Sequence, residues 1–293
     1  MINGIINVNK PEGITSFDVV RTIKRLCEKK EKVGHAGTLD PLATGVLPVC
    51  IGKATKIIDY VMNETKIYKA VLKLGVNTDT YDKEGSVVLT RSTEEITKEG
   101  LIKSLKAFIG EVSQVPPMYS ALKVNGTRLY ELARKGIEVE RQPRKVHIYS
   151  IDILSFNLPY AEILVHCSKG TYIRSLCYDI GEALNCGAAM WELERRKNGI
   201  FDINSSIKLE ELNSDNITEN LVSLEEALIK YPKIYLDDYF QKLFINGVAI
   251  QDKRLINTIP DSNQVYAVYS KDDALIGLGK KNNNSFKIEK LLI

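Results

Sequence analysis

A single carboxylate in a glycine-rich loop is the first feature of the sequence that could do chemistry. Residues 33–56 read VGHAGTLDPLATGVLPVCIGKATK and place Asp40 directly before Pro41. The proline ring keeps the preceding residue out of the helical region, so the backbone itself aims the carboxylate. Three nearby glycines leave room for a large flat ligand against the backbone. The loop indicates a catalytic acid, although Asp-Pro and glycine clusters are also typical of purely structural turns.

Other kinds of chemistry lack their usual residue spacings. The five cysteines form no Cys-x-x-Cys pair, and the three histidines form no His-Glu-x-x-His motif. Neither a disulfide framework nor a zinc site is therefore predicted. A hydrolase with paired carboxylates is disfavoured because the loop holds no second acid near Asp40, unless tertiary contacts bring one in. We expect chemistry without a metal ion.

Composition indicates a globular protein with a sizeable core. The chain has 293 residues, 44% of them hydrophobic, which is enough for one large domain and a small one. Its 40 Lys and Arg nearly balance 37 Asp and Glu, so a nucleic-acid site would need local clusters of positive charge. The sequence shows no signal-peptide pattern, and its apolar runs fall far short of the ~20 residues of a membrane helix. We expect a protein of the reduced cytoplasm, with no membrane partner.

Two helices are predicted from apolar periodicity and capping residues. Ser16 is the candidate N-cap of a helix whose apolar side chains, from Val19 to Cys27, fall on one face. A second helix near residues 97–109 has Thr97 as its candidate cap, with a glycine just beyond its end. The first of these helices would follow a strand at residues 3–9 and precede the Asp40 loop.

Alternating residues predict strands between and after these helices. In YKAVLKLG, Tyr68 shares one face with the apolar alternate residues and so points inward. Further alternation occurs at 145–154 and 161–167, and a helical period follows from Ile173. Because strands and helices mix without regular β-α-β alternation, an α+β fold is favoured over a doubly wound sheet.

The C-terminal sixty residues differ in pattern from the rest. Ser223 and Glu226 fit a capping box for a short helix, and Pro232 follows its end. After it come short β-like segments separated by polar turns. We expect two domains, at residues 1–230 and 231–293, the second small and β-rich.

The Asp40 loop closely resembles the catalytic motif of the bacterial tRNA pseudouridine synthase B family. Four further blocks, at residues 8–20, 66–85, 110–136 and 167–184, resemble family blocks in the family's order. The resemblance implies the α+β pseudouridine synthase fold, with a mixed, largely antiparallel sheet and a PUA-like C-terminal domain. It also implies that uridine 55 in the T-loop of tRNA is isomerised to pseudouridine without metal or cofactor.

The resemblance assigns catalytic roles to three residues. Asp40 would either attack covalently or assist removal of a ribose proton. Arg174 would pair with that carboxylate and keep it ionised in a site that excludes water. Tyr68 would stack on the flipped base and serve proton transfer at C5. From the residue types alone, Arg174 would be a surface arginine and Tyr68 a core tyrosine.

Six further residues are implied around the substrate. His35 would occupy the RNA space that the flipped nucleotide vacates, Asp82 would make polar contacts, and Leu193 would form an apolar wall. One departure is Ala189, which stands where the family usually has a histidine. The remaining implied RNA or site contacts are Lys10, Lys56 and Arg195.

A basic segment at residues 123–145 could follow a phosphate backbone, since it carries seven Lys and Arg against three Glu around Tyr130. The expected partner is the T-arm of tRNA, bound by a monomer that needs no other protein. Two alternatives remain open: a guide-RNA-dependent pseudouridine synthase, and a catalytically idle module that binds and folds tRNA.

Overall fold

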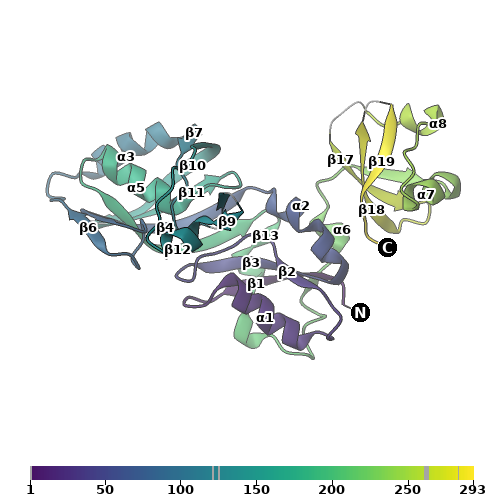
Figure 1. Cartoon of the computed structure of the whole chain (residues 1–293), viewed down its shortest axis with the longest axis horizontal. Helices are drawn as coiled ribbons and strands as arrows, with labels where there is room; N and C mark the ends of the chain where they lie inside the picture. Colours follow the sequence, from purple (N-terminus) through teal and green to yellow (C-terminus); the bar gives the residue numbers. More distant parts are fainter. Residues whose placement is uncertain (1, 121, 125, 261–263, 283) are drawn as a thin grey trace.

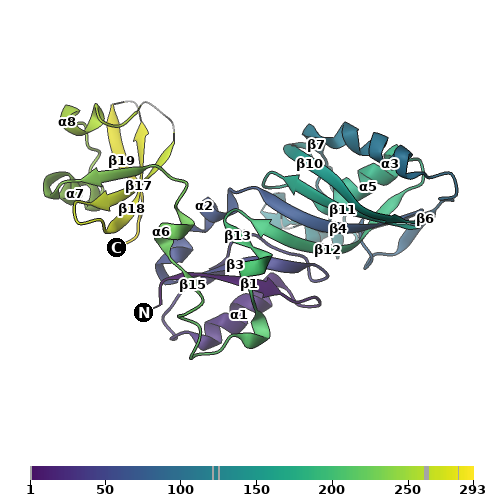
Figure 2. The same cartoon turned by 180° about the vertical axis from the view of Figure 1, so that it is seen from behind.

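The computed structural model describes residues 2–120, 122–124, 126–260, 264–282 and 284–293. Figure 1 and Figure 2 show an elongated molecule with a large mixed sheet and a smaller C-terminal sheet at one end. No described helix has both the length and the apolar character needed to cross a membrane.

In the described part of the chain, eleven strands form the large sheet. Its main path runs β14-β1-β3-β12-β4-β11-β10-β7, and only the β1–β14 and β3–β12 pairs in the sheet are parallel. The α+β prediction with a mixed, largely antiparallel sheet is therefore confirmed. The strands are β1 (Gly4–Lys10), β2 (Val33–His35), β3 (Thr44–Ile51), β4 (Lys66–Leu74), β7 (Gly110–Gln114), β10 (Arg144–Asn157), β11 (Tyr160–Cys167), β12 (Ala188–Asn198), β13 (Phe201–Asp202), β14 (Ile207–Lys208) and β15 (Leu221–Val222).

Helices cover this sheet and two hairpins extend from it. Pairing joins β5 to β6 and β8 to β9, outside the large sheet. These elements are α1 (Ser16–Leu26), α2 (Ile58–Met62), α3 (Lys98–Leu105), α4 (Leu129–Ala133), α5 (Ile173–Ala183), α6 (Leu224–Ala227), β5 (Val76–Thr78), β6 (Val87–Thr90), β8 (Lys123–Val124) and β9 (Thr127–Arg128).

The first helix begins one residue earlier than expected. Its N-cap is Thr15, which forms a capping box with Asp18, so the prediction that Ser16 caps the helix is wrong. Ser16 is buried, and its hydroxyl accepts from Leu39 N at 2.8 Å and donates to Leu39 O at 3.0 Å. The residue that resembled a cap is instead a link between α1 and the Asp40 loop.

The other predicted elements form where the patterns placed them. Thr97 caps α3, which ends at Leu105 because the chain then tightens into a 3₁₀ turn before Gly110. β4 alternates between buried and partly exposed residues, and Tyr68 lies on its buried face. Ser223 and Glu226 form the predicted capping box of α6.

The C-terminal sheet has the order β16-β17-β18-β19 and begins just after Pro232. One apolar cluster contains Val46 and Ile57 of the large part together with Tyr269 and Leu278 of this sheet. The assignment of residues 231–293 to a separate domain stays a prediction. The elements are β16 (Lys233–Leu236), α7 (Asp238–Ile245), α8 (Lys253–Ile256), β17 (Val265–Ser270), β18 (Leu275–Asn282) and β19 (Ser285–Leu291).

Candidate active site

Asp40 and Arg174, 134 residues apart in sequence, form an ion pair. Asp40 lies in the loop between β2 and β3, and Arg174 lies in the first turn of α5. The Nε–Oδ2 distance is 3.0 Å and the Nη2–Oδ1 distance is 3.3 Å, so the guanidinium grips both carboxylate oxygens. The Arg174 side chain is 7% exposed whereas that of Asp40 is 34% exposed. A substrate can therefore reach the carboxylate of Asp40 but not the guanidinium group of Arg174.

The Arg174 guanidinium also holds two other segments. Its Nη1 donates to Asp82 Oδ2 at 3.4 Å and to Thr80 O at 3.5 Å, and its Nη2 donates to Tyr119 O at 2.7 Å. Together with the two bonds to Asp40, these contacts give each of the five guanidinium N–H groups an acceptor. The arginine is thus fixed in one orientation by three parts of the chain.

Burial and neighbouring charges act in opposite directions on Asp40. Burial raises the pKa of its carboxyl group above the usual aspartate value, and the nearby Asp82 raises it further. The positive charges of Arg174 and Lys10 lower the pKa of the same group. The net direction is upward, so the ion pair offsets part of the cost of keeping a carboxylate charged at this position.

Lys10 joins the loop that follows β1 to the loop that carries Asp40. Its ammonium group donates to the carbonyl oxygens of Pro11 and Ile14 at 2.7 Å and of Pro41 at 3.1 Å. The side chain is fully buried, and burial lowers the pKa of Lys10 to about 8. Lys10 therefore lies beside the Asp40 loop, and its ammonium group is directed at backbone carbonyl oxygens.

Arg195 and Asn198 of β12 hold the first half of the same loop. Arg195 is 1% exposed and donates through Nε to Val46 O at 2.7 Å and through Nη2 to Gly37 O at 2.9 Å. Asn198 donates to Ala36 O at 2.9 Å. The structure thus places Arg195 within the support of the loop and not on a surface that RNA could reach.

Gly45 permits the close approach of this loop to β12. Its φ is +100°, and a Cβ at this position would lie 2.3 Å from the carbonyl oxygen of Arg195. Both the backbone conformation and the space therefore require glycine here. The approach lets β3 and β12 pair in parallel at Thr44 and Gly45, directly after the Asp40 loop.

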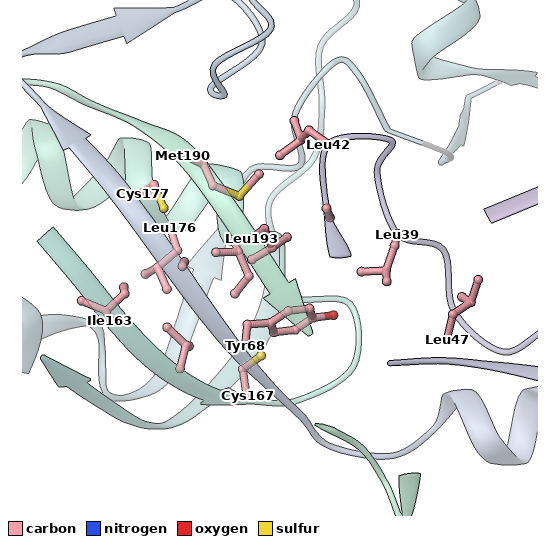
Figure 3. Close-up of a cluster of buried hydrophobic side chains, with 14 of the residues drawn as sticks. Leu39, Leu42, Leu47, Tyr68, Ile163, Cys167, Leu176, Cys177, Met190 and Leu193 are labelled. Atoms are coloured by element: carbon pink, nitrogen blue, oxygen red, sulfur yellow. The ribbon is translucent and has the colours of Figure 1, made fainter. Parts of the chain in front are cut away.

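Tyr68 and Leu193 form the apolar side of the site. Tyr68 is 9% exposed and Leu193 is 8% exposed, and both belong to one cluster with Leu39 of the Asp40 loop. Figure 3 shows the Tyr68 ring beside Leu193 and Cys167, with its hydroxyl group pointing away from the strands that carry these residues. Burial raises the pKa of Tyr68, while Arg195, its register partner in β12, lowers it.

His35 ends β2 and lies half-buried at the start of the Asp40 loop. Burial, with a smaller effect of the positive charge on Arg195, lowers the pKa of its imidazole below the usual value. A neutral ring at neutral pH suits stacking better than ionic contact. His35 thus precedes Asp40 at the start of the same loop, and its contact with RNA stays a prediction.

Lys56 is the predicted site residue that the structure places elsewhere. It lies in a 3₁₀ turn after β3, and its ammonium group donates to Leu291 O of the C-terminal sheet at 2.7 Å. The prediction that it lies near the active site is not supported by this geometry. Its contact stabilises the packing of the two sheets.

Gln114, which sequence reasoning missed, anchors the N-terminus of α5. Its Oε1 accepts from Tyr172 N at 2.8 Å and its Nε2 donates to Tyr172 O at 3.0 Å. The helix lacks an N-cap side chain, so this reciprocal pair satisfies a backbone N–H that would otherwise lack a partner. Ser16 and Asn198 were missed as well, because a polar residue that bonds to a distant backbone leaves no local signal.

No group of three or more His, Cys, Asp and Glu side chains in the described ranges is arranged to hold a metal ion. The functional groups that meet at Asp40 are instead a carboxylate pair, a guanidinium group, an ammonium group and a tyrosine. Such a set can hold an ionised acid beside a flat ligand and move protons.

Comparison with known families matches two regions of the chain. Residues 24–173 match the TruB family pseudouridylate synthase (N terminal domain), and residues 174–241 match the tRNA pseudouridylate synthase B C-terminal domain. Among curated relatives, tRNA pseudouridine synthase B of Clostridium tetani is 56% identical over 100% of both chains. That of Clostridium acetobutylicum is 54% identical, covering 99% of this chain and 100% of the relative.

Solved structures give the same result for the fold. Cbf5 in a Cbf5-Nop10-Gar1 complex superposes with a TM-score of 0.74 and 27% identity, covering 99% of this chain and 85% of that one. An archaeal box H/ACA sRNP Nop10-Cbf5 complex gives a TM-score of 0.72 and 26% identity, with 99% and 86% covered. With two family regions and full-length relatives above 50% identity, the chain belongs to the TruB family of pseudouridylate synthases.

Proposed function

We propose that this protein isomerises uridine 55 in the T-loop of tRNA to pseudouridine. The observation that carries the proposal is the two-point grip of Arg174 on Asp40, in a chain that shares its full length with tRNA pseudouridine synthase B relatives. The grip keeps an accessible carboxylate oriented and favours its ionised form, and the reaction needs both.

The reaction breaks the bond from N1 to C1′, turns the base and joins C5 to C1′. Asp40 either attacks the sugar or accepts a ribose proton, and both routes begin from the ionised carboxylate. In the new glycoside C5 must lose its proton and N1 must gain one, so in net terms one proton moves from C5 to N1, and we assign a role in this transfer to the Tyr68 hydroxyl. No atoms are gained or lost, so a substrate and these side chains account for the whole conversion.

The uridine must leave the RNA stack before Asp40 can reach it, at a cost of a few kcal/mol. The Tyr68 ring and the Leu193 side chain supply apolar contact for the extruded base. His35, at the edge of the same loop, would fill the space that the base leaves in the RNA. Asp82 acts through Arg174, to which it is bonded.

The basic segment at residues 123–145 would hold the RNA beside this site. In the segment that includes β9 and α4, the guanidinium groups of Arg128 and Arg134 lie 5.8 and 5.5 Å from the ring centroid of Tyr130. The segment joins the site through Tyr119, whose carbonyl oxygen accepts from Arg174. The side chain of Lys123 lies outside the described residues. The C-terminal sheet would touch the tRNA away from the target base.

A guide-RNA-dependent activity is the second candidate, because the Cbf5 structures share the fold. Full-length identity above 50% to relatives named for tRNA favours the stand-alone enzyme. We further propose that it acts as a cytoplasmic monomer without an obligate protein partner. An idle tRNA-binding module would retain the fold and bind tRNA without turnover.

The test incubates purified protein with an unmodified tRNA transcript and maps pseudouridine by carbodiimide treatment and primer extension. We expect product at position 55 with the wild type alone, and no detectable product with Asp40→Asn. The variant should bind tRNA within about fivefold of the wild type, since it keeps the shape of the site. Product that depends on an added guide RNA, or that appears at another position, would contradict the proposal, and binding without turnover would favour the idle module.

A further inference from the structure

Tyr81 has an unusual backbone conformation for a large side chain. Its φ is +65°, a left-handed conformation that bulky L-residues adopt only when their surroundings hold them there. Its ring stacks on that of Tyr178 with a centroid distance of 4.2 Å and an interplanar angle of 23°. Both residues are half-buried. The stacked pair therefore ties this strained turn to α5.

The two rings join the same two elements that the Arg174–Asp82 ion pair joins. Tyr178 follows Arg174 by one helical turn in α5, and Tyr81 directly precedes Asp82 in the turn after β5. The Arg174–Asp82 ion pair is buried next to Asp40, whereas the ring pair lies one turn further along α5. The contact between α5 and residues 78–84 thus has one polar and one aromatic part, side by side.

Backbone bonds hold the turn on its other side. Met190 N donates to Tyr81 O at 2.9 Å, and Lys83 N donates to Met190 O at 3.0 Å, which fixes the turn against β12. Thr80 Oγ1 donates to Asp82 Oδ1 at 2.6 Å, so one carboxylate oxygen is held within the turn. The other oxygen, Oδ2, accepts from Arg174. Small shifts of α5 relative to β12 would therefore act directly on the Asp82–Arg174 distance.

We propose that the Tyr81–Tyr178 stack is a positioning device that holds residues 78–84 against α5. In this position Asp82 and Thr80 O keep the Arg174 guanidinium in the orientation in which it bonds to both carboxylate oxygens of Asp40. The expected effect on the rate of pseudouridine formation rests on the proposed function. Neither tyrosine needs to touch the RNA. The rings act on the reaction through Asp82 and Arg174.

The first test measures single-turnover pseudouridine formation with Tyr81→Ala, Tyr178→Ala and the double variant. Each single substitution should lower the rate at saturating tRNA by about 5- to 20-fold, because small misplacements of reacting groups are costly. The rate of the double variant should be no lower than that of the slower single variant, since either substitution alone already removes the whole ring contact. The Kd for tRNA should stay within twofold.

Matched variants separate the ring contact from other effects. Tyr81→Phe and Tyr178→Phe keep both rings and should restore the wild-type rate. Tyr160→Ala removes a half-exposed tyrosine of β11 that contacts Trp191, and should leave the rate unchanged. A rate that is unchanged in Tyr81→Ala below its unfolding temperature would overturn the proposal, as would a weaker Kd with an unchanged rate at saturation.

A second readout does not depend on turnover. The carboxyl ¹³C shift of Asp40 can be titrated by NMR in the wild type and in Tyr81→Ala. We expect the pKa of Asp40 to rise in the variant, because a less well-held guanidinium stabilises the carboxylate less. An unchanged titration would overturn the positioning role, even if the wild type itself made no pseudouridine and the proposed function failed.

Discussion

At the scale of single residues, Asp40 combines accessibility with burial. A third of its side-chain surface is exposed, yet burial still raises its pKa above the usual aspartate value. Arg174 opposes that rise with two hydrogen bonds. Raising the pKa of a carboxylate makes it a stronger base or nucleophile once ionised, at the cost of a smaller ionised fraction in acid. The carboxylate of Asp40 is therefore more reactive at neutral pH, but a larger fraction of it is protonated in acid.

We predict an acidic decline in the single-turnover rate as the pH falls through the raised pKa of Asp40. The ionised form reacts, so protonation removes activity, and the decline should lie above the usual aspartate range. The measurement is single-turnover product formation at saturating tRNA across acidic to neutral pH. His35→Gln is the control, because His35 also titrates in acid. A decline that disappears in this variant would assign it to the histidine instead.

At the scale of elements, the Asp40 loop is held by side chains from three places. Ser16 of α1 binds Leu39, Lys10 of β1 binds Pro41, and Arg195 of β12 binds Gly37. Each contact joins a side chain to a backbone group of the loop, and Pro41 O accepts a further bond from Gly13 N at 2.8 Å. The loop is thus rigid because strands and a helix support it, and this support sets the direction of the carboxylate.

Replacing Ser16 with Ala should both destabilise the protein and slow the reaction. The change leaves two buried backbone groups of Leu39 without partners, which costs about 1–3 kcal/mol of unfolding free energy. The freed loop should lower the single-turnover rate by about tenfold. Urea denaturation and rapid-quench kinetics measure the two effects. Ser92→Ala, the same change at an exposed serine, should alter stability by less than about 0.5 kcal/mol, and equal effects in the two variants would contradict this role.

At the scale of the whole molecule, two sheets pack into one body on either side of a shared apolar cluster. Lys56 bonds to Leu291, and the rings of Tyr60 and Tyr231 meet edge to face at 5.9 Å. In the basic segment, β9 lies in the part of the molecule that contains β12 and α5, away from the C-terminal sheet (Figure 1). A tRNA bound at Asp40 would therefore meet positive charge on the basic segment and a second surface on the C-terminal sheet.

Replacing Arg128 and Arg134 together with Gln should weaken tRNA binding and its salt dependence. Each lost phosphate contact removes about 0.7–0.9 from the slope of log Kd against log salt, so the slope should fall by up to about two. Filter binding across a salt series measures it. The control is Lys103→Gln with Lys106→Gln, the same change in net charge at and just after α3. Equal slopes for the two double variants would show that the basic segment does not contact RNA through Arg128 and Arg134.

The sequence by itself determined much of the fold and the chemistry of the site. Periodicity placed Tyr68 inward and α5 around Arg174, because one buried face requires a regular spacing of apolar residues. The Asp40 loop and its neighbouring blocks indicated the family, which the full-length relatives confirm. These features are local, since each is written in consecutive residues.

Only the tertiary structure decided which polar residues serve which neighbours. Ser16 had the sequence pattern of a cap, yet its hydroxyl bonds to Leu39, 23 residues away. Lys56 and Arg195 had the charge of RNA contacts, yet they donate to carbonyl oxygens of Leu291 and of the Asp40 loop. A hydrogen bond to a distant backbone depends on how sheets and helices pack, and any residue can supply the carbonyl. Local sequence therefore indicates which side chains can bond, while packing chooses the partner.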